Sequence, residues 1–305
     1  MKKDISKLIK YIDTLEVKPK QTVDLKKDFE TDYDHKMLTK EEGEELLAWG
    51  ITKLAEMQDK LYAAGKESVL LIFQAMDAAG KDSAIKHIMT GLNPQGVKIT
   101  SFKVPNKLEQ SHDYLWRHYI ALPAAGEIGI FNRSHYENVL VTRVHPEYIL
   151  SETLSGIGNI KEANQKFWNK RFEQINNFEK YLSENGTLIL KFFLHVSKKE
   201  QKRRFIERID DESKNWKFAV GDLKERARWK DYRLAYEDML SNTSTKEAPW
   251  FVVPADDKWF SRLIIGKIIH SEFEKLKLEY PKINLEQKTE LEKAKAELLG
   301  ENNND

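Results

Sequence analysis

Short apolar runs alternate with stretches of helical periodicity along most of this chain. Apolar runs of this length, bounded by polar residues, are typical of buried strands in a parallel sheet. The alternation therefore predicts an α/β fold, with a mainly parallel sheet flanked by helices. The expected strands cover residues 68–74, 97–102, 127–131, 187–196 and 250–255, and the expected helices cover 82–92, 108–120, 160–183, 222–242 and 257–276.

The two ends of the chain carry weaker patterns. Residues 41–64 place leucines at helical spacing, and Thr39 is the candidate N-cap of this helix. Residues 1–40 indicate irregular structure or a short helix. Residues 285–299 indicate a charged helix, and residues 301–305 indicate a disordered tail.

Composition excludes several classes of protein. Lys and Arg total 50 against 49 Asp and Glu, which argues against a general nucleic-acid or polybasic membrane-binding protein. The absence of cysteine excludes disulfide scaffolds, thiolate catalysis and Cys-based metal sites. The longest apolar run, near residues 69–73, is too short for a membrane helix. We therefore expect a cytoplasmic protein that binds neither nucleic acid nor membrane.

Polar clusters follow four of the expected strands, at residues 77–81, 132–137, 197–208 and 256–258. In open parallel sheets, ligands bind at the carboxyl ends of the strands. The four clusters are therefore expected to form one shared site.

Residues 75–82 form an incomplete Walker A phosphate loop. Gly80 and Lys81 occupy their usual places, but Ala75 replaces the first glycine and Asp82 replaces the Ser or Thr that usually holds Mg²⁺. Asp77 is then a candidate metal ligand, because Mg²⁺ favours carboxylates together with phosphate oxygens and water. The alternative is an ordinary strand-to-helix turn, in which Asp77 caps the helix and Lys81 faces solvent. The expected phosphate-binding residues are Ala78, Ala79, Gly80, Lys81, Asp82 and Ser83.

Two further segments carry chemistry. In residues 130–137, Asn132 stands where a Walker B carboxylate is expected, Arg133 is suited to clamp a phosphoryl group, and Glu137 is a second metal candidate. His135 is favoured as a structural residue over a phosphate carrier.

A basic helix is expected from residue 198. The spacing places Gln201, Arg204 and Arg208 on one face, and Phe205 and Ile209 on a buried stripe. A second basic stretch at residues 214–233 is typical of a nucleotide-kinase lid, although a solvated charged surface is the alternative.

Five segments, in order along the chain, resemble the polyphosphate kinase 2 family. They are FQAMDAAGKDS, LPAAGEIGIFNRSHYENVLV, QKRRFIER, NWKFAVGDLKERARWKDYRLAYEDML and TSTKEAPWFVVPADDKWFSR, within about residues 32–274. The FNRSHYE form resembles the class III branch, which phosphorylates nucleoside mono- and diphosphates. The resemblance implies a P-loop kinase fold with a helical lid, and reversible, Mg²⁺-dependent transfer of the terminal phosphoryl group of polyphosphate to AMP or ADP.

The resemblance also implies roles for individual residues. Asp77 and Lys81 match the Walker A acid and lysine, Glu137 falls near the metal, and Asn138 stands where many members have Asp. The implied catalytic residues are Asp77, Lys81, Arg133, Arg204 and Arg208, the implied metal ligands are Asp77 and Glu137, and Asn132, Arg117 and Lys103 join the phosphate- and nucleotide-binding set. The expected polyphosphate track comprises Lys81, Lys198, Lys202, Arg204 and Arg208.

The chain is then expected to comprise an N-terminal helical extension (1–66), a P-loop kinase domain (67–280) with a lid at about 198–232, and a C-terminal helix and tail (281–305). The expected partners are polyphosphate, AMP, ADP and ATP, with guanine nucleotides as further candidates. Mg²⁺, replaceable by Mn²⁺, is the expected cofactor, and a homo-oligomer (dimer or tetramer) is the expected assembly.

Three rival functions stay open at this point. One is an ATP-dependent nucleoside monophosphate kinase, and another is a nucleotide-binding protein without turnover, which Asn132 and Asn138 would permit. The third is a phosphohistidine mechanism, which would need His135 or His195 as the carrier.

Overall fold

Strand β2 (Ser68–Ala75), whose eight residues are all buried, lies inside a six-stranded sheet. The computed structural model describes residues 2–33 and 38–300. The strand order is β1-β6-β5-β2-β4-β3, and every neighbouring pair is parallel except β1 with β6. The chain therefore builds β3 and β4 on one side of β2, and then β5 and β6 on the other. Loops at such a reversal form a crevice at the carboxyl edge of the sheet.

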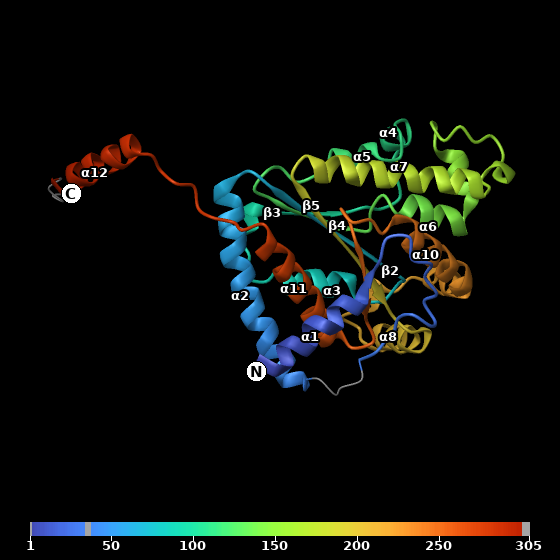
Figure 1. Cartoon of the computed structure of the whole chain (residues 1–305). Helices are drawn as coiled ribbons and strands as arrows, with labels where there is room; N and C mark the ends of the chain where they lie inside the picture. The colour runs from blue at the N-terminus through green and yellow to red at the C-terminus, as the bar shows by residue number, and fades with distance from the viewer. Residues whose placement is uncertain (1, 34–37, 301–305) are drawn as a thin grey trace.

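Helices cover both faces of the sheet (Figure 1). Because side chains alternate along a strand, Val69, Leu71 and Phe73 of β2 pack on one face, while Leu70 and Ile72 pack on the other. Helices α1, α2, α3 and α11 cover the first face, and α6, α7 and α10 cover the second.

The remaining elements have the following bounds: α1 (Lys2–Leu15), β1 (Glu16–Val17), α2 (Lys40–Ala64), α3 (Lys81–Ile88), β3 (Val97–Ser101), α4 (Lys107–Gln110), α5 (Trp116–Tyr119), β4 (Ile128–Asn132), α6 (Glu137–Val144), α7 (Gln165–Glu184), β5 (Thr187–His195), α8 (Lys198–Asp210), α9 (Gly221–Ala227), α10 (Trp229–Thr243), β6 (Trp250–Pro254), α11 (Lys258–Lys275) and α12 (Leu285–Gly300). Short 3₁₀ helices cover Pro94–Gly96, Pro146–Ser151, Ile160–Glu162 and Asn215–Lys217.

The α/β fold and its strands are confirmed, and each of the five expected strands lies within one residue of its predicted ends. Thr39 caps α2 as expected, because its side chain accepts from the Glu42 amide and the Glu42 carboxylate accepts from the Thr39 amide. Two expected helices are broken, at 108–120 into α4 and α5 and at 222–242 into α9 and α10. The expected helix at 82–92 ends at Ile88, and α6 was not predicted.

The N-terminal segment is more ordered than its sequence suggests. Leu8, Ile12 and Leu15 form a buried stripe on α1, and β1 pairs with β6 at the edge of the sheet. Charged residues between these positions hide the stripe in the sequence. This segment joins the same core as β2, while the domain boundary at residue 66 stays a prediction.

Two expectations at the other end of the chain also have outcomes. Ile209 is half exposed, because residues 206–210 of α8 extend beyond the core and contribute no buried side chain. The expected charged C-terminal helix is present as α12, which stands away from the body (Figure 1). The expected tail at residues 301–305 lies outside the described residues. No helix in the described part of the chain combines the length and apolarity that crossing a membrane requires.

Candidate active site at the carboxyl edge of the sheet

The loop after β2 has the strained backbone of a phosphate-binding turn. Ala78 has a φ of 59° and Gly80 a φ of 104°, so the chain turns sharply into α3. The Lys81 side chain folds back, and its Nζ donates to the Ala75 carbonyl at 3.0 Å. Burial and the nearby Arg133 guanidinium lower the pKa of Lys81. The lysine is therefore held inside the turn, which agrees with the phosphate-loop interpretation and not with a solvent-facing side chain.

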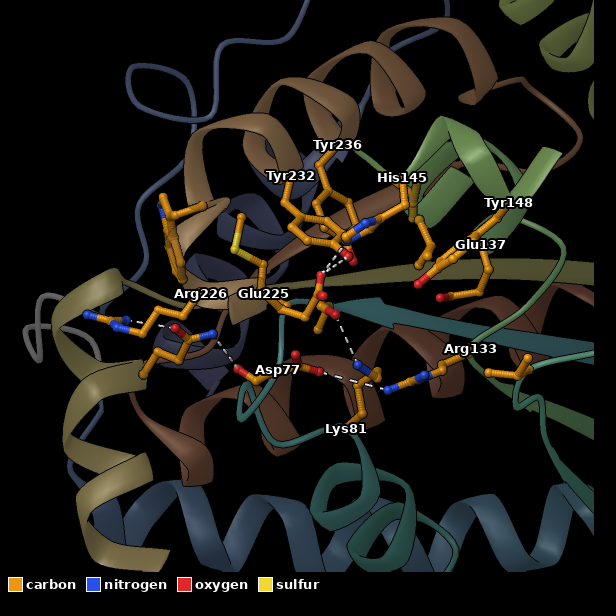
Figure 2. Close-up of a pocket in the computed structure, with 17 residues that line it drawn as sticks. Asp77, Lys81, Arg133, Glu137, His145, Tyr148, Glu225, Arg226, Tyr232 and Tyr236 are labelled. Atoms are coloured by element: carbon orange, nitrogen blue, oxygen red, sulfur yellow. Dashed lines mark hydrogen bonds and ion pairs between the residues drawn. The ribbon is translucent and has the colours of Figure 1, made fainter. Parts of the chain in front are cut away.

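The segment after β4 faces this loop. Arg133 also has a left-handed backbone, with a φ of 62°, and its amide donates to the Phe73 carbonyl at 3.2 Å. Its guanidinium Nη2 lies 3.8 Å from Asp77 Oδ1. Glu137 begins α6, and burial raises its pKa although Arg133 and Lys81 attract the carboxylate. Figure 2 shows Asp77, Lys81 and Arg133 along one side of a pocket, with Glu225, Tyr232 and His145 on the opposite side.

Three adjoining cavities meet at Arg133. The cationic cavity has a volume of about 610 Å³ and is lined by the phosphate loop, Lys103, Lys214, Lys217 and Lys258. The apolar-walled cavity, of about 310 Å³, exposes mainly apolar surface, but charged side chains line it as well, among them Lys103, Glu109, Arg117, Glu137 and Glu152. The central cavity, drawn in Figure 2, has about 230 Å³ and contains Glu225 and Arg226 from α9. Arg133 lines all three cavities, so a group passing between them would contact its guanidinium.

The structure brings most of the predicted site residues together. Lys198 and Lys202 are exceptions, because both are exposed on α8 and line none of these cavities. Arg117 and Glu137 line the apolar-walled cavity, with Lys103 between that cavity and the cationic one. The predicted residues that line the cationic cavity are Asp77, Ala78, Ala79, Gly80, Lys81, Asp82, Ser83, Lys103, Asn132, Arg133, Arg204 and Arg208.

Arg204 makes contacts that the sequence did not predict. The sequence predicts a phosphate-binding arginine, whereas the guanidinium is buried and donates to five acceptors of the protein itself. These are Glu200 Oε1 and the carbonyls of Ala78, Ala79, Ala255 and Asp256, at 2.6–3.1 Å. An arginine has five N–H groups, so none is left for phosphate in this arrangement. Arg204 instead joins the phosphate loop to the end of β6.

We therefore expect Arg204→Ala to lower both turnover and stability. Loss of the guanidinium leaves buried carbonyl groups without donors, which costs at least about 1–3 kcal/mol in the free energy of unfolding. Urea unfolding and steady-state turnover measure the two effects. Arg203→Ala is the matched control, because Arg203 is the exposed neighbour on α8 and pairs only with Glu200 and Glu207. An Arg204→Ala enzyme that is inactive but as stable as the wild type would instead support direct binding of phosphate by Arg204.

Sequence reasoning placed Gln201 on the same helix face as Arg204 but gave it no role, and it missed the contacts of Glu225. Gln201 donates to the Asp77 carbonyl at 2.9 Å and accepts from Arg226 at 2.7 Å, so it joins the phosphate loop to α9. Glu225 of α9 accepts from Tyr232 at 2.6 Å and contacts His145 at 2.9 Å. Most of these hydrogen bonds join residues that are far apart in the sequence, so no local sequence pattern predicts them.

A buried network lies beneath the segment that carries Arg133 and Glu137. Lys191, at the centre of β5, donates to Glu179 (2.6 Å), the Tyr136 hydroxyl (2.8 Å) and the Thr243 carbonyl (2.6 Å). Glu179 also accepts from Tyr136 at 2.7 Å and contacts His135 at 3.2 Å. The sequence does contain a sign of this network, because Lys191 interrupts the apolar run TLILKFFLHV. A lysine buried in a strand needs a buried acidic or polar partner.

The same network bears on the phosphohistidine alternative. His135 is fully buried against Glu179 and faces none of the three cavities. His195 contacts the Leu25 carbonyl at 3.1 Å, and burial lowers its pKa to about 4. Neither histidine is placed to carry a phosphoryl group, which favours the structural interpretation of His135.

The donor set can be compared with the needs of Mg²⁺. In the described part of the chain, no group of three or more histidine, aspartate or glutamate side chains is arranged to hold a metal. Asp77 and Glu137 nevertheless share the central cavity with Lys81 and Arg133. Mg²⁺ is commonly held by one or two carboxylates together with substrate phosphates and water. The residues therefore fit a cation that arrives with, and is partly held by, a phosphorylated substrate.

Comparison with known proteins assigns the family. The model of the family "Polyphosphate kinase 2 (PPK2)" matches residues 37–281. The chain belongs to the polyphosphate kinase 2 family. It is 49% identical over 261 residues to the ADP-polyphosphate phosphotransferase of Rhodopseudomonas palustris, covering 86% of this chain and 89% of that protein. It is 44% identical over 229 residues to the AMP/ADP-polyphosphate phosphotransferase of Meiothermus ruber, covering 75% and 80%.

A solved structure extends the likeness to the fold. The crystal structure of polyphosphate kinase 2 from Arthrobacter aurescens TC1 aligns with a TM-score of 0.79 and 39% sequence identity. The alignment covers 90% of this chain and 97% of that one. The α/β architecture of this polyphosphate kinase 2 member is therefore shared along nearly its whole length.

Proposed function

We propose that this chain transfers the terminal phosphoryl group of inorganic polyphosphate to AMP and ADP. The observation that carries the proposal is the meeting of two unlike cavities at Arg133, with Lys81 lining the cationic one. The cationic cavity is lined by eight Lys and Arg side chains against four carboxylates, and by a single aromatic residue, Phe102, which suits a polyanion without a base. The apolar-walled cavity suits a nucleoside, because its exposed wall is mainly apolar and its many polar side chains can bind the polar groups of a sugar and a base.

Direct transfer between two phosphates needs no nucleophilic side chain from the protein. The nucleotide phosphate is itself the nucleophile, and the transition state is loose, so the protein mainly positions groups and neutralises charge. Lys81 and Arg133 lie where the transferred phosphoryl group would pass, while Arg208 and Lys258 face the polyphosphate side. Arg117 lines the nucleoside side, and its Nε has no hydrogen-bond partner in the described chain. A divalent cation, held by Asp77 and Glu137 when bound, would add positive charge at the phosphates.

The names of the relatives support this proposal and extend it. The Rhodopseudomonas protein is named for ADP and the Meiothermus protein for AMP and ADP, which supports both acceptors. GDP is a further candidate, because a GDP-polyphosphate phosphotransferase of Pseudomonas aeruginosa is 35% identical over 75% of this chain. Mg²⁺ as the cation and a homo-oligomeric assembly stay predictions.

Donor specificity tests the proposed function. Purified protein is incubated with Mg²⁺ and AMP or ADP, with polyphosphate or ATP as the single donor, beside Lys81→Ala as the control. ATP formed from ADP and polyphosphate, and lost in the variant, is the expected result. Transfer from ATP to AMP without transfer from polyphosphate would make the chain an ATP-dependent kinase. Nucleotide binding without either transfer would favour the binding protein.

Polyphosphate binding should also respond strongly to salt. A chain of phosphates that displaces counterions loses affinity steeply as salt rises. The KM for polyphosphate should therefore rise by about tenfold or more between about 50 and about 200 mM salt, and the KM for AMP should rise much less. Initial rates at several salt concentrations measure both constants. Equal salt dependence for the two substrates would contradict a dedicated cationic cavity for polyphosphate.

A further inference from the structure

Two residues that depart from the Walker patterns contact each other. Asn132 Nδ2 donates to Asp82 Oδ1 at 2.6 Å, across 50 positions of sequence. Asp82 is the second residue of α3, directly after Lys81, and Asn132 is the last residue of β4. Both line the cationic cavity. The unusual residues at the Walker A and Walker B positions therefore form one contact in the structure, although they look unrelated in the sequence.

Compared with an ordinary P-loop enzyme, the carboxylate has moved from the Walker B strand to the position after the Walker A lysine. A P-loop enzyme ordinarily has a hydroxyl after the lysine and a carboxylate on the Walker B strand, and both serve the metal. Here the carboxylate stands on α3, and the neutral donor stands on β4. An asparagine amide can donate through its NH₂ group, whereas an aspartate at the same place could only accept when ionised. Asn132 can thus donate to the Asp82 carboxylate, as it does here, whereas the usual ionised aspartate at this position would repel it.

The new position also suits the negative charge. Asp82 lies in the first turn of α3, where the helix dipole stabilises a carboxylate. Asn132 engages Oδ1, while Oδ2 makes no hydrogen bond within the described chain. Asp82 is exposed to the cavity that contains Lys81 and Arg133. One oxygen is therefore fixed in direction, and the other is available to a ligand.

We propose that Asp82 supplies the carboxylate that Asn132 lacks, and that it binds the divalent cation of the reaction while Asn132 positions it. This inference rests on the proposed function, and it adds Asp82 to the metal ligands that the sequence predicts. Asp77 and Asp82 come from the two ends of the phosphate loop, and both line the cationic cavity in which they would hold the cation. Asn132 acts through Asp82 and is a positioning residue.

Metal-dependent melting tests the assignment without turnover. The melting temperature is measured with ADP alone and with ADP plus increasing Mg²⁺. Asp82→Asn keeps a hydrogen-bonding group of the same size but removes the charge. It should raise the Mg²⁺ concentration at half-maximal shift by at least about tenfold, the effect expected even for a group that only supports a metal ligand, with little change in the metal-free melting temperature.

The converse substitution should have the opposite sign. Asn132→Asp places two carboxylates in contact, so the metal-free protein should melt earlier because like charges repel. Mg²⁺ would neutralise the pair, so the metal-dependent shift should grow. The double variant Asp82→Ser/Asn132→Asp rebuilds the usual hydroxyl and carboxylate, and should recover a metal response that Asp82→Asn lacks. A purely structural contact would leave the metal response of both single variants unchanged, whatever their metal-free melting temperatures.

Asp231→Asn is the matched control, because this exposed carboxylate of α10 lies outside the three cavities. It should retain the wild-type metal response. An Asp82→Asn protein that responds to Mg²⁺ as the wild type does would overturn the inference. That result would leave polyphosphate-dependent transfer standing, whereas an inactive wild-type protein with an Asp82-dependent metal response would overturn the proposed function alone.

Discussion

Replacing Lys81 by alanine should lower the turnover of ADP and polyphosphate by about 10³-fold or more, the effect of removing a preorganised charge from a transition state. Lys81 lines both the cationic and the central cavity, so its ammonium faces the path between donor and acceptor. Burial, and after it the nearby Arg133, lower the pKa of Lys81, so a bound anion would favour the charged form of this side chain. The loss should appear in kcat, because the charge that Lys81 neutralises grows during transfer.

The structure also predicts that this variant folds. The Lys81 side chain makes one hydrogen bond, to the Ala75 carbonyl, so urea unfolding should change by only about 1 kcal/mol. Lys86→Ala is the control, because Lys86 is exposed at the other end of α3 and lines none of the three cavities. A Lys81→Ala enzyme within tenfold of the wild-type kcat would exclude Lys81 from the phosphoryl path.

The contrast between Lys81 and Arg204 shows what a sequence can specify about this site. Lys81 lies in a local turn, and the loop residues around it fix where its side chain points. Arg204 lies on a helix whose spacing correctly predicts that it faces the phosphate loop, but its acceptors come from residues 78–79 and 255–256. The spacing cannot distinguish a guanidinium that reaches phosphate from one that uses all its donors on the protein.

The strands were predictable for a physical reason that does not extend to the chain ends. Strands β2, β4, β5 and β6 are mainly buried and apolar on both faces, so they stand out as continuous runs, whereas the edge strand β3 has no buried residue. The α1 helix buries only one stripe and carries charge elsewhere, so its contribution to the core is hidden. The contact between Asp82 and Asn132 could not be predicted for another reason. Each residue by itself only departs from a Walker motif, and no sequence pattern connects the two.

Lys191 offers the second large effect, on stability. Lys191→Met should lower the free energy of unfolding by about 3–5 kcal/mol, because it leaves Glu179 charged and buried without its cation. Burial opposes ionisation of Glu179, but the attraction of Lys191 and His135 outweighs it and holds the pKa of Glu179 below its usual value. The three hydrogen bonds of Lys191 also tie Tyr136 to the end of α10, so kcat should fall as Arg133 and Glu137 lose support.

A double-mutant cycle separates the ion pair from simple loss of packing. Glu179→Gln added to Lys191→Met removes the unpaired charge and still offers an acceptor to Tyr136. The double variant should therefore be more stable than Lys191→Met alone, with urea unfolding of all four proteins giving the coupling energy. Additive losses, with the double variant the least stable, would mean that Lys191 contributes through packing. Recovery of stability without recovery of kcat would show that the network positions the catalytic segment as well as holding the core.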